Sequence, residues 1–374
     1  MHESTPILPT AGRPTEAPDA LDTPDVPDTR RIAHCIGTGG ELFWLSLKVW
    51  LLSLITLGVY SFWGKARVRR YLWSHSLVLG DPLEYTGTGG ELFRSFLLVI
   101  IPFGMLWLGF SALGARYPAS SLLLIVIGVP FAHYAAFQAL RYRLTRTRWR
   151  GIRGNMTGSA IRYALKASLY SLLAVVTLGI AMPHSKARQT SLRANAAWFG
   201  SRRFAFSGTG GPLYRAWFAS AGLWLLFTIA LATLLLGGVY LIEQVYGIRT
   251  EGWLAFSVMP VMLLLACAFF FSFLIYRAAC LRWLADNLRF GGVRFAAPQI
   301  TARALFRLHA INLLLLICTL GLAHAWTQVR ILRFMQNRVL YCGDPDLETL
   351  LQDTKPVTVS GEGFLDALDM DIGL

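Results

Sequence analysis

Six polar side chains interrupt long apolar stretches of this sequence, and their chemistry makes them candidates for a site. They are Lys48, His133, Gln138, Lys166, His309 and Asn312. Burying such groups in an apolar medium is costly unless a partner or water compensates. Imidazole titrates near neutral pH, so His133 and His309 could share a water-filled cavity or change charge there. The alternatives are an interhelical hydrogen bond for each histidine and, for Lys48 and Lys166, an ammonium group that reaches a polar surface.

A compound motif supplies further polar residues and occurs twice with the same internal spacing. In each copy, a Thr-Leu-Gly sequence is followed by a lysine, an arginine and a Gly-Thr-Gly-Gly segment, which begin 9, 11 and 31 residues after the threonine. The copies are Thr56-Leu57-Gly58, Lys65, Arg67 and Gly87-Thr88-Gly89-Gly90, and Thr177-Leu178-Gly179, Lys186, Arg188 and Gly208-Thr209-Gly210-Gly211. A third copy begins at Thr319-Leu320-Gly321 and keeps Arg330 at the same offset. Equal offsets predict that one supersecondary unit has been duplicated.

The composition places these residues in a membrane protein. Hydrophobic residues form 55% of the chain and charged residues 15%, and the mean hydropathy is +0.49. Seven apolar runs cover residues 42–63, 95–114, 118–140, 167–182, 216–242, 253–276 and 308–326. Most of them reach the roughly 20 residues that span a bilayer core. A soluble fold would have too little polar surface to cover seven such runs, so we expect a polytopic membrane protein.

The order of the runs predicts an all-α fold with the plan X-Y-X-Y-X. Each X is an apolar segment that ends near Thr-Leu-Gly, and each Y is a transmembrane hairpin. If every X crosses once, the two X-Y units are inverted and the basic loop 185–215 is external, against the positive-inside bias. If X re-enters or lies in the interface, with its glycine at the break, every basic loop faces the cytoplasm. We favour the second arrangement, which has parallel repeats, broken or re-entrant X segments and short cytoplasmic strands.

Charge divides the chain into a basic centre and two acidic tails. The formal net charge is +14, although residues 1–31 and 344–374 hold most of the acidic side chains. We expect a disordered N-terminal tail over 1–31, a repeat-built transmembrane domain over 32–343 and a cytoplasmic C-terminal tail over 344–374. The expected partners are membrane lipids with anionic headgroups, and no nucleic-acid-binding motif accompanies the charge. We also expect the segment 361–374 to dock on the basic cytoplasmic face.

Neither catalysis nor a bound cofactor is predicted. The five cysteines form no Cys-x-x-Cys pair and the seven histidines no His-Glu-x-x-His motif, so neither a disulfide framework nor a metal site is indicated. The sequence also lacks a Gly-x-Ser-x-Gly elbow and paired catalytic carboxylates. We therefore expect a protein that is not an enzyme and that holds no metal or cofactor.

The Gly-Thr-Gly-Gly segments are interpreted as helix starts, because they lack both the P-loop ending and the dinucleotide-binding spacing. Thr38 and Thr88 each precede a glutamate by three residues, which is the spacing of a capping box. A proline takes the place of the glutamate in the third segment, and proline is favoured in a first helical turn. Binding of an anion or headgroup by backbone N–H groups is the alternative. We expect the extended pieces at 83–86 and 204–207 to pair with one another.

Three motifs are long enough to compare with known sequences. They are GTGGELF at 37–43 and 87–93, TLGVYSFWGKARVRRYLWSH at 56–75 and GEGFLDALDMDIGL at 361–374. Through them the chain resembles the YjgN-like family of bacterial inner-membrane proteins, over a region that begins near residue 32. The resemblance implies a bacterial inner-membrane location and carries no established activity or catalytic residues. The later X segments have AMPHSKARQ and AHAWTQVRI in place of VYSFWGKAR, so the resemblance does not by itself carry a binding role of the aromatic residues over to them.

The leading functional hypothesis is a membrane protein that moves or gates a small solute or a lipid, because discontinuous helices often build substrate sites in transporters. It predicts a polar cavity formed by Thr56, Thr177 and the buried histidines. The alternative is a structural or envelope-maintenance protein whose basic face binds anionic lipid or a protein partner; an enzyme that acts on a lipid is a weaker third. The candidate solute- or lipid-binding residues are Lys48, Thr56, Gly58, Lys65, Arg67, His133, Gln138, Lys166, Thr177, Gly179, Lys186, Arg188, His309 and Asn312.

Overall fold

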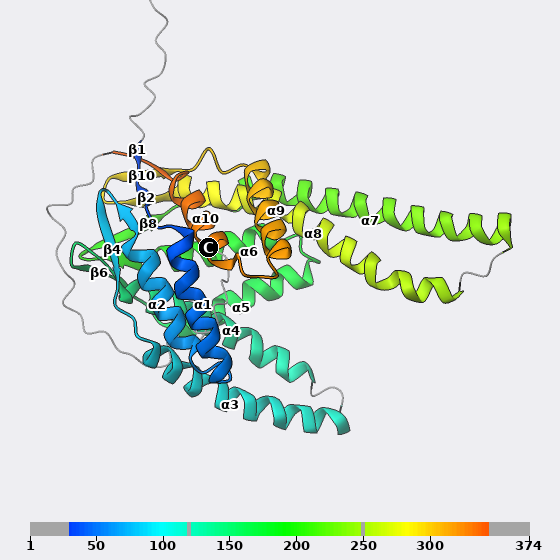
Figure 1. The fold of residues 1–374 in the computed structure, drawn as a ribbon, viewed down its shortest axis with the longest axis horizontal. Helices are drawn as coiled ribbons and strands as arrows, with labels where there is room; N and C mark the ends of the chain where they lie inside the picture. Colours follow the sequence, from blue (N-terminus) through cyan, green and yellow to red (C-terminus); the bar gives the residue numbers. More distant parts are fainter. Residues whose placement is uncertain (1–29, 118–120, 248–250, 344–374) are drawn as a thin grey trace, which may run out of the picture.

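Pairs of helices alternate with short strands in a computed structural model of the chain, which describes residues 30–117, 121–247 and 251–343 (Figure 1). The helices are α1 (Gly39–Ile55), α2 (Ser61–Ser74), α3 (Gly89–Arg116), α4 (Ser121–Arg146), α5 (Ala160–Val176), α6 (Met182–Ala194), α7 (Gly211–Tyr246), α8 (Glu251–Asn287), α9 (Ala302–Cys318) and α10 (His324–Gln336). The strands are β1 (Arg30–Arg31), β2 (Ala33–Cys35), β3 (Ser76–Val78), β4 (Asp81–Tyr85), β5 (Thr147–Trp149), β6 (Ile152–Met156), β7 (Ala197–Phe199), β8 (Arg202–Phe206), β9 (Leu288–Phe290), β10 (Val293–Ala296) and β11 (Leu340–Cys342).

The strands form one antiparallel sheet that closes on itself. Its order is β1-β11-β10-β9-β8-β7-β6-β5-β4-β3-β2, so most strands pair with their neighbours in the chain. The segment 30–35 joins the two ends, because β1 pairs with β11 and β2 pairs with β3. Between these strands, Ile32 donates its N–H to the Val339 carbonyl at 3.5 Å and accepts the N–H of Leu79 at 3.0 Å. We call this closed sheet the strand ring.

The strand ring shows that the all-α prediction is wrong. Its strands have only two to five residues, which is too short for an alternating pattern to stand out among the long apolar runs. The pieces at 83–86 and 204–207 lie largely in β4 and β8, but they do not pair with one another. Instead β4 pairs with β3 and β5, and β8 with β7 and β9, because tight turns and helical pairs bring these strands together.

Two-residue turns fix the register of the β-hairpins. The turns with positive φ at both residues are Leu79-Gly80, Arg150-Gly151 and Gly291-Gly292. This is the backbone of a type I′ turn, whose twist matches that of the flanking strands. The helical pairs are thus connected by stiff, short β-hairpins.

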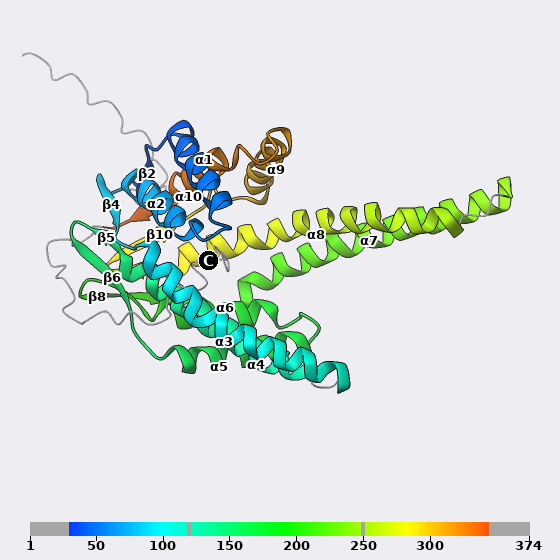
Figure 2. The same cartoon turned by 60° about the horizontal axis from the view of Figure 1, so that its bottom comes forward.

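Every described helical pair leaves the strand ring and returns to it on the same side (Figure 1, Figure 2). α3 and α4 connect the paired strands β4 and β5, and α7 and α8 connect the paired strands β8 and β9. The three pairs that contain Thr-Leu-Gly likewise lie between paired strands, namely β2 and β3, β6 and β7, and β10 and β11. A segment that joins neighbouring strands of one sheet cannot cross a bilayer only once. The chain reverses at each Thr-Leu-Gly, a geometry that agrees with broken or re-entrant X segments and differs from the arrangement with single crossings.

The three Thr-Leu-Gly turns have the same backbone geometry. The φ angles are 50°, 49° and 50° at Leu57, Leu178 and Leu320, and 89°, 87° and 89° at Gly58, Gly179 and Gly321. In the first turn, Gly58 donates its N–H to the Ser53 carbonyl at 2.7 Å, as in a helix-ending Schellman motif. The Thr56 hydroxyl donates to the Leu52 carbonyl at 2.8 Å and accepts the N–H of Tyr60 at 2.9 Å. One hydroxyl thus ends the first helix and supports the start of the second.

The Gly-Thr-Gly-Gly segments begin helices, and the returning helices cover them. At α3, Thr88 and Glu91 form the expected capping box, whereas Thr38 at α1 makes no side-chain cap and α7 begins with a proline in its first turn. An added Cβ on Gly39, Gly89 or Gly210 would lie 2.1, 2.5 or 3.0 Å from Trp326, Trp63 or His184. Each of these three partners is the fifth residue after a Thr-Leu-Gly glycine. The two motifs therefore meet in space.

Within residues 30–117, 121–247 and 251–343, three helical segments are long and apolar enough to cross a membrane. They are Gly89–Gly114, Gly211–Val245 and Met259–Asn287. α7 has 36 residues, which at 1.5 Å per residue is roughly 54 Å and exceeds the bilayer core of about 30 Å. The α7–α8 pair extends well beyond the other helices (Figure 2).

The first and last described helical pairs contact one another beside the strand ring. Helix α10 packs on α1 around buried Leu42 and Val329, so the last helical pair contacts the first. Of the tail predicted over 1–31, the structure describes only Arg30–Arg31, and these residues form β1. The tail predicted over 344–374, with the docking segment 361–374, lies outside the described residues.

Candidate functional site

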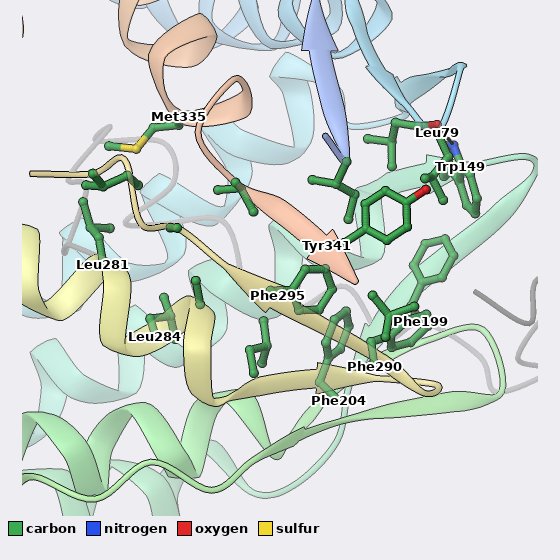
Figure 3. Close-up of a pocket in the computed structure, with 18 of the residues that line it drawn as sticks. Leu79, Trp149, Phe199, Phe204, Leu281, Leu284, Phe290, Phe295, Met335 and Tyr341 are labelled. Carbon is green, nitrogen blue, oxygen red and sulfur yellow. Dashed lines mark hydrogen bonds between the residues drawn. The ribbon is translucent and has the colours of Figure 1, made fainter. Parts of the chain in front are cut away.

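A cavity of about 450 Å³ lies inside the strand ring. Side chains from β3, β4, β5 and β7 to β11 line it, together with the last turns of α8. Figure 3 shows Phe204, Phe290, Phe295 and Tyr341 around a common space. The volume falls within the range of about 300–1,000 Å³ typical of small-molecule sites. We call this space the ring cavity.

Strand alternation explains why the wall is apolar. In β9 and β10, Phe290, Val293 and Phe295 line the ring cavity. Arg289 and Arg294 alternate with them and are exposed. Successive side chains of a strand point to opposite faces, so the ring has an apolar inner face and a basic outer face here.

Aromatic rings form a continuous part of the wall. The ring centroids are 6.1 Å apart for Trp149 and Phe199, 6.2 Å for Phe199 and Phe290, and 4.7 Å for Phe204 and Phe290. The indole N–H of Trp149 donates to the Val78 carbonyl at 3.0 Å. The polar group of this side chain therefore already has a hydrogen-bond partner within the protein. Such contacts hold the wall in place without a ligand.

Among the described residues, no charged side chain lines the ring cavity, and the polar side chains in its wall are Tyr341 and Trp149. A polar solute would lose its water there and gain few hydrogen bonds in return. An apolar ligand needs no such compensation. The site is therefore suited to binding a hydrocarbon group and offers no acid, base or nucleophile for covalent chemistry.

The residues predicted to bind a ligand lie elsewhere. Thr56 and Thr177 use their hydroxyls in the turns, where Thr177 donates to the Leu173 carbonyl at 2.8 Å. Gly58 and Gly179 supply the positive φ angles of the same turns. The exposed side chains are Lys48, Arg67, Lys166 and Arg188, and the half-buried one is Lys65.

The two histidines contact different helices and are not brought together. His133 on α4 hydrogen-bonds Ser171 on α5 at 2.9 Å, and Gln189 on α6 donates to the same serine at 3.2 Å. His309 on α9 instead packs edge-on against Phe270, with 5.6 Å between ring centroids. The interhelical hydrogen bond, weighed as an alternative for each histidine, is thus the contact that His133 makes.

Two amides are buried. The Gln138 amide donates to the Tyr134 hydroxyl at 3.1 Å within α4. Asn312 is 5% exposed, and neither polar atom of its side chain has a hydrogen-bond partner among the described residues. An unsatisfied buried amide costs free energy, and no described cavity explains this one.

Lys186 lines a separate cavity of about 170 Å³ between α6 and α8, beside Tyr276 and Cys280. Burial lowers the pKa of its ammonium group to about 8; the charges of Arg193 and Arg277 act in the same direction, and Cys280 opposes them. Within the described ranges, no three His, Cys, Asp or Glu side chains gather as a metal site. The absence of a cofactor remains a prediction.

The residues of the ring cavity are almost all apolar, so polar groups within apolar runs do not indicate them. One signal could have found them. Residues 288–295 read Leu-Arg-Phe-Gly-Gly-Val-Arg-Phe, in which apolar residues alternate with arginine on both sides of a Gly-Gly turn. That pattern predicts a β-hairpin with one apolar face.

Curated relatives connect this fold with a membrane. The chain is 23% identical over 363 residues to "Inner membrane protein YjgN" of Salmonella typhimurium, an alignment that covers 86% of this chain and 91% of the relative. It is 31% identical over 133 residues to the protein of that name from Escherichia coli O157:H7, and 30% over 129 residues to that of strain K12, which is 34% of this chain and 31% of the relative in both cases. No solved structure matches the chain significantly.

The names of these relatives and the three apolar helices support a membrane location. The resemblance found in the three sequence motifs is confirmed. Because a family model matches residues 34–367, the chain belongs to the family described as "Bacterial protein of unknown function (DUF898)".

Proposed function

We propose that this protein binds the acyl chain of a lipid in the ring cavity and exchanges it with the membrane around its apolar helices, without covalent chemistry. The observation that carries the proposal is the wholly uncharged, largely aromatic and aliphatic wall of a cavity of about 450 Å³. A hydrocarbon occupant matches such a wall, because it needs no hydrogen bonds to replace those that it gives up in water.

A lipid is favoured over a small polar solute. Transport of a polar solute requires hydrogen-bonding or charged groups along its path. The threonines predicted to form a polar cavity are used in turns, and the histidines contact different helices. A hydrocarbon chain instead matches the lining by Phe204, Phe290 and Phe295.

Exchange between membrane and cavity would be nearly balanced in free energy. Moving a chain from water into an apolar site gains about 0.8 kcal/mol for each methylene group. A chain that comes from a bilayer has already gained this amount, so only shape and packing against the wall distinguish the two locations. The balance permits reversible loading, which movement or presentation of a lipid requires.

The Thr-Leu-Gly turns support insertion of the helical tips into an apolar phase. Leu57, Leu178 and Leu320 have positive φ and are 94%, 93% and 94% exposed. This conformation costs roughly 1–2 kcal/mol in a residue with a Cβ, and a leucine in water gains nothing to offset it. Leucine is suited to this position if the turns lie in the membrane. The basic loops would then place the strand ring on the cytoplasmic side.

Equilibrium binding of a neutral single-chain lipid tests the proposal. The protein, held in a nonionic amphipol, is titrated with monoacylglycerols of increasing chain length below their aggregation concentrations. We expect one saturable site, and an affinity that rises about tenfold or more for every two methylene groups until the cavity is full. Partitioning that never saturates would show that the chains enter only the amphipol belt, and would count against the function.

One observation favours the alternative of a scaffold for an anionic partner. Arg148, Arg203, Arg289 and Arg294 are exposed on the outer face of the strand ring. A basic surface of this kind attracts anionic lipid or acidic protein without any need for a cavity. The titration separates the two functions, because a scaffold has no saturable chain site.

A further inference from the structure

Another cavity, of about 250 Å³, lies between α9 and α10 and is lined by four arginines. They are Arg303, Arg307, Arg330 and Arg338. The other described residues around it are apolar apart from Thr301, and none of the described lining residues is acidic. Four guanidinium groups at one site repel one another, so an anion between them would lower the free energy. We call this site the arginine pocket.

Local contacts hold part of the arginine pocket in place. The guanidinium carbon of Arg338 lies 3.9 Å from the centroid of the Phe334 ring, which orients this side chain. Its Nε is buried and finds no hydrogen-bond acceptor within the described ranges. The Thr301 hydroxyl accepts the N–H of Ala304 at 3.2 Å and begins α9 at the pocket. The first turn of a helix also favours negative charge.

The helical pair itself does not require these arginines. α1, α5 and α9 each begin 17 residues before the threonine of their turn, so positions can be compared by offset. The residues that correspond to Arg303, Arg307 and Arg338 are Gly40, Trp44 and His75 in the first pair, and Ile161, Leu165 and Ala196 in the second. Arg330 has arginine counterparts in both other pairs, Arg67 and Arg188. The first two helical pairs therefore have the same plan without arginines at the positions of Arg303, Arg307 and Arg338.

We propose that the arginine pocket binds a phosphate group, presented either by an anionic lipid headgroup or by free phosphate. Guanidinium groups match phosphate oxygens in shape and donate paired, charge-assisted hydrogen bonds. Arg307 comes from α9, Arg330 comes from α10 and Arg338 follows the end of α10, so the anion would bridge two helices. This site goes beyond the binding of an acyl chain, and it holds phosphate whether or not the ring cavity is filled.

The arginine pocket and the ring cavity are neighbours. Ile300, Met335 and Val339 line the ring cavity, and the adjacent residues Thr301, Phe334 and Arg338 line the arginine pocket. The same short segments thus form both walls. A phosphate-bearing lipid could place its headgroup and its chain in sites that share these segments.

The test is a titration of the full chain in a nonionic amphipol with three probes. Dioctanoyl phosphatidic acid carries chains and phosphate, dioctanoylglycerol carries the same chains without phosphate, and inorganic phosphate carries no chain. The variants are Arg307→Gln and Arg330→Gln, with Arg188→Gln as the matched control, because Arg188 has the offset of Arg330 but lies outside the pocket. Thermal unfolding shows that each variant is folded.

We expect Arg307→Gln and Arg330→Gln each to weaken phosphatidic acid binding about tenfold or more, and Arg188→Gln and dioctanoylglycerol binding to remain unchanged. Inorganic phosphate that binds and competes would identify free phosphate as a ligand; phosphatidic acid that binds alone would identify the headgroup. Equal affinities in all variants, or an equal loss in Arg188→Gln, would overturn the proposal. Loss of dioctanoylglycerol binding in every sample would instead count against the ring cavity.

Discussion

Replacement of Ala285 by phenylalanine is expected to lower the affinity for a monoacylglycerol at least tenfold. Ala285 is 8% exposed on α8 and lines the ring cavity with Leu281 and Leu284. The added ring would occupy space that a chain needs, and each methylene group displaced from the apolar site costs about 0.8 kcal/mol. Two displaced groups already correspond to about tenfold. The measurement is the amphipol titration described above.

Ala205→Phe is the matched control. Ala205 is exposed on β8, next to Phe204, which lines the ring cavity. The substitution therefore adds the same atoms to the outer face of the same ring and should leave the affinity unchanged. Because Ala285 belongs to a packed cluster, thermal unfolding of both variants must accompany the titration. If folded Ala285→Phe protein binds the chain as tightly as the original protein, the ring cavity is not the binding site.

Replacement of Gly89 by alanine is expected to destabilise the protein strongly. A Cβ at this position would lie 2.5 Å from the Cα atom of Trp63, and a backbone atom cannot move without shifting α2. Overpacking of this kind typically costs 1–3 kcal/mol and occasionally more, so we expect a loss of about 3 kcal/mol. The measurement is thermal unfolding in detergent at a fixed scan rate.

The neighbouring glycine provides the control. A Cβ at Gly90 would meet nothing within 4 Å. Alanine has a higher helix propensity than glycine, so Gly90→Ala should be neutral or stabilising by up to about 1 kcal/mol. Gly210→Ala and Gly211→Ala form a second pair of this kind. A Cβ at Gly210 would lie 3.0 Å from His184, whereas a Cβ at Gly211 would meet nothing within 4 Å. Similar melting of Gly89→Ala and Gly90→Ala would show that α2 and α3 are not packed as described.

The sequence predicts the apolar helical hairpins and favours a break at each Thr-Leu-Gly, although the all-α class that it predicts is wrong. Long apolar runs and the Thr-Leu-Gly spacing predicted where helices lie, and the even distribution of arginine favoured reversal at Gly58 and Gly179 over a single crossing. The paired strands on both sides of each turn agree with this choice. That the three pairs arose by duplication remains a prediction.

The strand ring and its cavity could not be predicted in the same way. A strand of three residues such as β5 has no measurable period, and its partners depend on the helical pairs that separate the strands. The ring also closes through β1, in residues expected to be a disordered tail. A site made of one or two apolar residues from each of eight strands forms no compact sequence motif. A polar residue within an apolar run, such as His133, can instead be recognised from the sequence wherever it lies.

The central claim, that a hydrocarbon chain occupies the ring cavity, is tested most directly by locating the end of a bound chain. A monoacylglycerol with a diazirine at its chain terminus is bound at a 1:1 ratio and irradiated, and the labelled residues are identified by mass spectrometry. We predict saturable labelling of Phe204, Phe290 and Phe295, which excess unlabelled lipid suppresses and Ala285→Phe reduces. Labelling confined to the exposed apolar faces of α7 and α8, with none inside the strand ring, would contradict binding of the chain in the ring cavity.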